Sequence, residues 1–103
     1  MSTLWDFSMS PMDKGKSVSK YVARSLEIIA DSGIPYKLNS MSTTLEGNIE
    51  EDVRVFLDCF YKMAEDCDRI TATIKMDYHA GRENGLVSKI QSVEEKVGRE
   101  LNK

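Results

Sequence analysis

The sequence predicts an α+β protein with one antiparallel sheet, and three observations lead to this prediction. Residues 3–10 and 69–78 alternate between apolar and polar side chains, as strands with one buried face do. Three other segments repeat apolar residues at steps of three and four, which is typical of amphipathic helices. The length of 103 residues suits one two-layer core. We therefore expect residues 1–103 to form a single domain.

The first strand and the first helix are expected within residues 3–32. The apolar face of the strand consists of Trp5, Phe7 and Met9. Ser17 is a favourable N-cap for the helix, and Gly33 supplies the left-handed residue that commonly ends one. The inner stripe of the helix recurs at three- and four-residue steps and comprises Val18, Tyr21, Val22, Ser25, Leu26 and Ile29.

Two short strands and a second helix follow. The strands are expected at residues 36–40 and 42–46, and Gly47-Asn48 marks the turn after them. The helix is expected over residues 50–66, because three acidic residues in its first turn interact favourably with the helix dipole. Its predicted apolar stripe consists of Ile49, Val53, Phe56, Leu57, Phe60 and Met63.

The last strand and a third helix complete the chain. Residues 69–78 alternate strictly and give the clearest strand pattern. After a polar loop at residues 79–85, a helix carries apolar residues on one side, with Gly98 near its end. These apolar residues are Leu86, Ile90, Val93, Val97 and Leu101. The simplest interpretation of this helix is a solvated outer face and an ordinary inner stripe, although its many charges also suit a partner protein.

These elements follow one another in the order β-α-β-β-α-β-α. The first six match the ferredoxin-like βαββαβ arrangement, which is a four-stranded antiparallel sheet with two helices on one face. The seventh is an extra C-terminal helix. Alternation in the outer strands predicts that one face of the sheet meets the helices and that the other face is more polar.

Composition and charge argue against several classes of protein. The net charge is −3 and the pI is about 5.1, so the chain lacks the basic footprint of a nucleic-acid-binding protein. No apolar run approaches the roughly 20 residues that a membrane span needs. Residues 1–10 contain Asp6 and no basic residue, unlike the start of a signal peptide. We therefore expect a cytoplasmic protein that binds neither nucleic acid nor membranes.

The sequence gives little support for catalysis or metal binding. The single histidine, His79, has no cysteine or serine nearby in the sequence to activate as a nucleophile. Cys59 and Cys67 lie in one predicted helix about 12 Å apart, which is too far for a disulfide, so buried thiols are expected. One histidine and scattered carboxylates do not form a metal-ligand pattern. We expect a protein that is not an enzyme and that holds no metal or cofactor.

Residues 41–47 form the most informative polar segment. They place adjacent threonines and a glutamate on a short strand, where Thr44 and Glu46 share one face and Thr43 and Leu45 share the other. On composition alone, these are ordinary strand residues and a solvated carboxylate.

Two further polar segments are open to two interpretations each. Lys75 and Asp77 share a face of the last strand with Thr71 and Thr73, and they form either a surface ion pair or part of a polar pocket. Residues 13–17 precede a helix N-terminus and are either an anion-binding loop or a solvated one.

Four segments together resemble the thiamine-binding protein family. Residues 17–23 resemble the start of its first helix, and residues 41–47 resemble its Gly-Thr-Thr-Ile-Glu-Gly strand and turn. Residues 73–77 and 92–97 resemble its final strand and C-terminal helix. The segments occur in the correct order over nearly the whole chain. The resemblance implies a ferredoxin-like fold that assembles into dimers and often tetramers, and the binding of thiamine or its hydroxymethylpyrimidine part.

The resemblance also implies which residues contact the ligand. Thr43, Thr44 and Glu46 are the first candidates, because a pyrimidine site needs hydroxyl and carboxylate partners beside an apolar wall. Further candidates, for polar contacts or for stacking on a ring, are Ser17, Lys75, Asp77, Tyr21 and Trp5. The thiazolium cation of thiamine suits an acidic protein. The predicted function is a non-enzymatic carrier, sensor or salvage accessory, and the alternative is a structural or regulatory homo-oligomer without a small ligand of its own.

Two places depart from the family pattern. Ser42 stands where the family usually has glycine, and Asp13-Lys14 stand where the family often has Gly-Thr. A side chain at position 42 restricts how closely a ligand approaches the backbone. We expect these departures to affect the identity of the ligand more than the fold.

Overall fold

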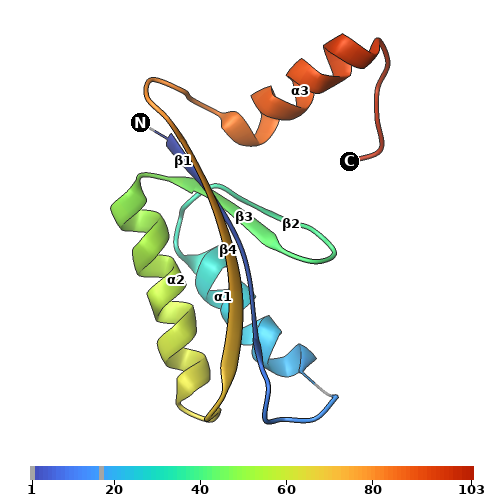
Figure 1. The fold of residues 1–103 in the computed structure, drawn as a ribbon. Coiled ribbons are helices and arrows are strands. Elements are labelled where there is room, and N and C mark those ends of the chain that lie inside the picture. Colours follow the sequence, from blue (N-terminus) through green and yellow to red (C-terminus); the bar gives the residue numbers. More distant parts are fainter. Residues whose placement is uncertain (1, 17) are drawn as a thin grey trace.

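Four antiparallel strands form one sheet in the order β2-β3-β1-β4, and two helices pack on one of its faces (Figure 1). The computed structural model describes residues 2–16 and 18–103. Its elements are β1 (Ser2–Pro11), α1 (Ser19–Asp31), β2 (Tyr36–Leu38), β3 (Thr43–Gly47), α2 (Ile49–Ala64), β4 (Ile70–His79) and α3 (Gly85–Val97). This is the predicted ferredoxin-like βαββαβ order with an added C-terminal helix.

The core lies between the sheet and the pair α1 and α2. Strand β1 is central, and it pairs with β3 on one side and with the full length of β4 on the other. The predicted apolar face of β1 is confirmed, since Phe7 and Met9 are buried and Trp5 packs against the core. Leu4, on the opposite face, is also buried. The start of α3, which contacts β1 and β3, covers that end of the open face.

The helix ends follow from local chemistry. Asn48 and Glu51 form a reciprocal capping box at the start of α2, with bonds of 2.8 and 3.1 Å. Gly33 has a φ of 79° just beyond α1, as its position predicted. The predicted N-cap of α1 is wrong: α1 begins at Ser19 after Val18, without a side-chain cap, and Ser17 lies outside the described residues.

The buried face of α2 differs from the predicted stripe. The buried residues are Asp52, Val55, Cys59 and Met63, whereas the predicted Ile49, Leu57 and Phe60 are exposed. Apolar residues occupy more than half of the circumference of α2, so periodicity alone did not choose the face that packs. The buried face also contains Asp52 and Cys59, so it does not form a continuous apolar stripe in the sequence.

Strand β4 has the predicted alternation but not a covered apolar side. Ile74, Met76 and Tyr78 are 44, 51 and 50% exposed. They point to the helix side of the sheet, because they pair in register with Phe7, Trp5 and Thr3. The strand is at the edge of the sheet, where Ile70 packs against the core and the residues from Ile74 onward are less covered.

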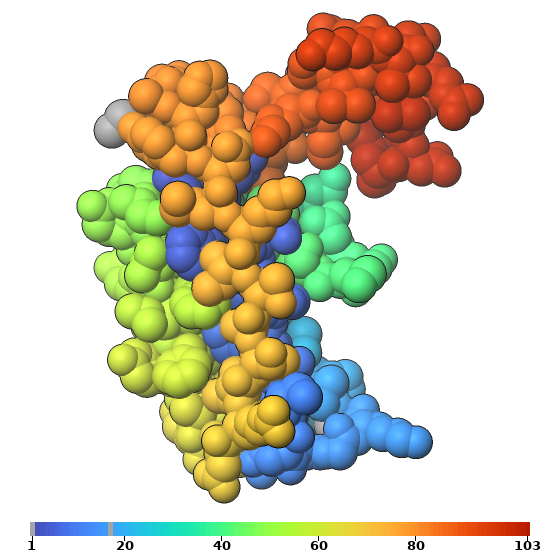
Figure 2. Space-filling model, viewed as in Figure 1, coloured from blue at the N-terminus to red at the C-terminus, as the bar shows by residue number. Residues whose placement is uncertain are grey.

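Helix α3 projects from the rest of the molecule. Figure 2 shows it and the C-terminal residues protruding, with a notch between them and the segment of β2 and β3. The radius of gyration is 15.0 Å, compared with about 13 Å for a compact chain of this length. The prediction of an ordinary inner stripe is wrong for α3, since Val93 and Val97 are more than half exposed. The start of α3 contacts the sheet, at β1 and β3, whereas Val93 and Val97 lie on the part of the helix that projects.

Candidate ligand-binding site

A partly open cavity of about 220 Å³ lies between α1 and the loop that joins β2 to β3. Its walls combine apolar side chains with a few polar ones, including Phe7, Ile29, Leu38, Ser25, Asn39 and Thr43. Pockets for drug-sized ligands usually measure roughly 300–1,000 Å³. A cavity of this smaller size fits one ring of a ligand, and leaves the remainder of a larger ligand outside.

Two buried hydroxyl-bearing residues line this cavity from different elements. Thr43 projects from the helix side of β3 and Ser25 from the inner face of α1, and both are almost completely buried. Alternation along β3 places Thr43 on this side together with Leu45, as predicted. Hydroxyl groups set in apolar walls orient a ring by hydrogen bonding while the walls enclose its faces.

Thr44 lies on the opposite, open face of the sheet. Its hydroxyl donates a hydrogen bond of 2.8 Å to Oδ1 of Asp6, and the hydroxyl of Ser42 donates one of 2.9 Å to the same oxygen. Lys75 is on this face as well, because it pairs in register with Asp6. The adjacent threonines therefore do not face one pocket.

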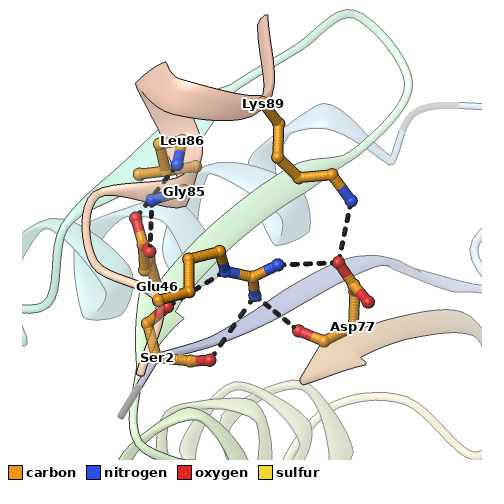
Figure 3. A network of polar contacts seen from close by, with 7 residues as sticks. Ser2, Glu46, Asp77, Gly85, Leu86 and Lys89 are labelled. Atoms are coloured by element: carbon orange, nitrogen blue, oxygen red, sulfur yellow. Dashed lines mark hydrogen bonds and ion pairs between the residues drawn. The ribbon is translucent and has the colours of Figure 1, made fainter. Parts of the chain in front are cut away.

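Glu46 is also on the open face, where it caps the N-terminus of α3 (Figure 3). Its carboxylate accepts hydrogen bonds of 2.6 and 3.0 Å from the amides of Gly85 and Leu86. Burial disfavours the charged carboxylate, but these amides and the nearby Arg82 outweigh that effect, so the pKa of Glu46 is below its usual value. Asn84, the residue before α3, provides no side-chain cap, so a strand residue distant in sequence supplies it.

Asp77 takes part in a second set of contacts that hold α3 (Figure 3). Arg82 donates to a carboxylate oxygen and to the backbone carbonyl of Asp77, both at 2.8 Å, and Lys89 on α3 lies 2.7 Å from the same carboxylate. Lys89 and Arg82 together lower the pKa of Asp77 to about 2.

The remaining predicted site residues lie elsewhere. Tyr21 is buried on α1, with Lys20 and Arg24 about 5.0 and 4.9 Å from its ring centroid. Trp5 packs edge-to-face on Phe56 of α2, with ring centroids 5.8 Å apart. Ser17 lies outside the described residues.

Of the eight predicted contact residues, the structure therefore brings only Thr43 to the cavity among those it describes. Sequence reasoning did not single out Ser25, Asn39 or Arg82. Ser25 was detectable as a serine within an otherwise apolar stripe, whereas Arg82 in a polar loop gave no signal.

Two features are absent from the described residues. Residues 2–16 and 18–103 contain no group of three or more His, Cys, Asp or Glu residues placed to hold a metal ion. Within the same ranges, no helix has the length and apolar character to cross a membrane. Cys59 and Cys67 are free and buried, as expected, and burial raises the pKa of the Cys59 thiol to about 11.

The fold and the cavity define a class: ferredoxin-like α+β proteins with a small, partly open cavity between the first helix and the loop that joins β2 to β3. The sequence profile of the thiamine-binding protein family matches residues 5–94. The chain belongs to this family. It is 31% identical over 90 residues to the UPF0045 protein of Methanocaldococcus jannaschii. The aligned residues cover 87% of this chain and 90% of that relative.

Solved structures agree with this assignment. A crystal structure of the Methanocaldococcus jannaschii protein superposes with a TM-score of 0.84 at 30% identity, over 91% of this chain and 97% of that one. A Thermotoga maritima protein, whose name refers to thiamine biosynthesis or salvage, gives a TM-score of 0.73 at 21% identity over 95% of this chain and 97% of that one. At that identity the second likeness shows the shared fold alone.

Proposed function

We propose that the protein is a non-enzymatic binding protein for thiamine or its hydroxymethylpyrimidine moiety, and that it acts as a carrier, sensor or salvage accessory. One observation carries the proposal: in a member of the thiamine-binding protein family, Thr43 of the shared motif lines a ring-sized, partly open cavity. The mixture of hydroxyls and apolar walls suits a substituted pyrimidine.

The proposed binding mode divides thiamine between the cavity and the surface. The pyrimidine ring occupies the cavity, with Thr43 and Ser25 as hydrogen-bond partners and Phe7, Ile29 and Leu38 as walls. The thiazolium cation stays at the cavity mouth, where the net negative charge of the protein favours it. Affinity then comes mostly from the part that thiamine and hydroxymethylpyrimidine share.

Titration calorimetry with thiamine and hydroxymethylpyrimidine tests this proposal. We expect both compounds to bind wild-type protein, and Thr43→Val to weaken binding by about 1–3 kcal/mol, because the variant keeps the shape and loses one buried hydrogen bond. Thr73→Val is the matched control, since Thr73 is exposed on the open face of β4. Absence of binding heat from both compounds with folded wild-type protein would reject the proposal.

We also propose self-association into a dimer through the exposed edge of β4, and into a tetramer made of two such dimers. This strand has ten residues in unbroken register with β1, and it carries Ile74 and Met76 half exposed beside the partly exposed apolar side of α2. An edge with these features favours pairing with another strand. With a two-fold axis at Met76, Lys75 is opposite the partner's Asp77, so the charges on the open face are complementary.

The mass of the protein in solution tests the self-association. We expect Ile74→Lys to shift the dimer towards monomer, because it places a charge on the apolar side of the edge strand. Val97→Lys is the control, because Val97 is more than half exposed on the projecting helix α3, away from the proposed interface. A wild-type monomer at all concentrations would reject this part. Dimers that bind neither compound would favour the alternative, a structural or regulatory homo-oligomer.

A further inference from the structure

The loop between β2 and β3 forms one wall of the cavity but has few attachments of its own. Residues 39–42 all line the cavity. A backbone bond of 2.8 Å from the Asn39 amide to the Ser42 carbonyl only joins the two ends of the loop to each other. The side chain of Met41 is 88% exposed. A wall of this kind needs an anchor to the sheet if the cavity is to keep its shape.

The anchor that the structure provides is the carboxylate of Asp6 on the central strand. Its Oδ1 accepts the hydroxyl of Ser42 at 2.9 Å and that of Thr44 at 2.8 Å, and both bonds are partly buried. Asp6 and Thr44 are direct partners in the register of β1 and β3. Hydrogen bonds to an ionised carboxylate are roughly twice as strong as neutral ones.

The two bonds flank Thr43, the residue that faces the cavity. Ser42 and Thr44 are its neighbours on either side, and both are held on the open face by the same oxygen. The backbone at position 43 is therefore fixed from one face of the sheet while its side chain projects from the other. Ser42, the residue that stands in place of the family glycine, supplies one of these two bonds.

We infer that Asp6 is a positioning residue for the ligand site: it acts through Ser42 and Thr44, from the face of the sheet opposite the cavity, to fix residues 39–42 and the Thr43 hydroxyl. This inference rests on the proposed function for its effect on affinity. Its effect on the loop is independent of any ligand. Asp6 itself does not line the cavity.

The test compares Ser42→Ala with wild-type protein by two measurements. Amide hydrogen exchange reports the order of residues 39–42, and calorimetry with hydroxymethylpyrimidine reports affinity. We expect faster exchange confined to this loop and binding weakened by roughly threefold to tenfold, as the loss of one anchoring bond predicts. The melting temperature is expected to change little, because Ser42 lies outside the core.

Two further variants connect the effect to the carboxylate. Asp6→Ala removes both bonds and is expected to have a larger effect on exchange and affinity than Ser42→Ala. Asp6→Asn keeps an oxygen that accepts and is expected to restore most of the loop protection. Thr73→Ala, an exposed hydroxyl on the same face, is the control and is expected to leave both measurements unchanged.

The outcomes separate this inference from the proposed function. If wild-type protein binds neither thiamine nor hydroxymethylpyrimidine, the proposed function fails, and the exchange measurement still decides whether Asp6 anchors the loop. Loop exchange that is the same in Ser42→Ala, Asp6→Ala and wild type would overturn the inference. A loosened loop with unchanged affinity would overturn it as well, because the anchor would then have no role in binding.

Discussion

The two faces of β3 carry similar residues and use them differently. On the helix side, Leu45 is fully buried in the core and Thr43 lines the cavity. On the open side, the Thr44 hydroxyl is bonded to Asp6, and the Glu46 carboxylate is bonded to the first amides of α3. Within one short motif, alternate residues therefore contribute to the candidate cavity and to the attachment of other chain segments.

The difference follows from what covers each face. Two helices exclude water from the helix side of β3. A polar group there costs free energy unless it lies beside a cavity or has a hydrogen-bond partner. The open side has one helix end and polar side chains within reach, so its carboxylates bind backbone amides and hydroxyls. A hydroxyl or carboxylate in a motif is thus not by itself a ligand contact, and the face decides its use.

The largest expected effect is on the helix side. Leu45→Ala removes a side chain that is 0% exposed, and we expect it to lower the free energy of unfolding by about 2–5 kcal/mol, because a cavity is left in the core. Denaturant unfolding measures this loss. Thr44→Ala, one residue earlier on the open face, is expected to cost less than ~2 kcal/mol. Similar losses from both variants would show that the two faces are equally important for stability.

The next effect concerns a buried acid at the corner between β3 and α2. Asp52 is 0% exposed. Burial, with smaller contributions from the Glu51 and Glu46 carboxylates, raises its pKa from 3.8 to about 7, although the Gly47 amide acts in the opposite direction. Between pH 4 and 7 the folded state therefore holds a proton that the unfolded state has lost.

Stability is consequently expected to fall as the pH rises through this range. The contribution of Asp52 is of the order of 4 kcal/mol, because the pKa difference between 3.8 and about 7 corresponds to ~1.4 kcal/mol per pKa unit. Other groups, including Glu46 with its lowered pKa, change stability with pH in the opposite direction. The difference in the free energy of unfolding between wild type and Asp52→Asn therefore isolates the contribution of Asp52. Unfolding measured at pH 4.5 and 7.5 tests it, and an identical pH dependence in the two proteins would contradict it.

The fold was predictable from the sequence because periodicity and turn residues determine the order of the elements. The strict alternation of residues 69–78 and the glycine at position 33 each gave the correct element or boundary. The face of α2 was not predictable, since apolar residues surround most of that helix. The exposure of α3 was not predictable either, because periodicity shows which side of a helix is apolar and not whether anything covers it.

The candidate site was predictable only where local pattern determines geometry. Alternation placed Thr43 and Thr44 on opposite faces correctly. Which face contains the cavity depends on the packing of α1 and the path of residues 39–42, and these are tertiary features. The capping of α3 by Glu46 joins positions 39 residues apart, so no short-range pattern indicated it.

A moderate effect is expected where the open face holds α3. Glu46→Gln removes the charge that caps the helix, and we expect a loss of about 1–2 kcal/mol, together with faster amide exchange in α3. Glu83→Gln, an exposed acid in the adjacent loop, is the control. Unchanged protection of α3 in Glu46→Gln would mean that Arg82 and Lys89 are sufficient to hold the helix.

The smallest effect is expected at Lys75, which is exposed on the open face and pairs in register with Asp6. Lys75→Gln is expected to change the free energy of unfolding of the monomer by less than ~0.5 kcal/mol, because exposed charges contribute little. Calorimetric titration of Lys75→Gln with thiamine then tests whether the ligand contacts the open face of the sheet as well as the helix side. If thiamine binds only on the helix side, the affinity stays within about twofold of wild type. A loss of tenfold or more would place part of the ligand on the open face, and Thr44 and Asp6 would then have to be tested as ligand contacts in their own right.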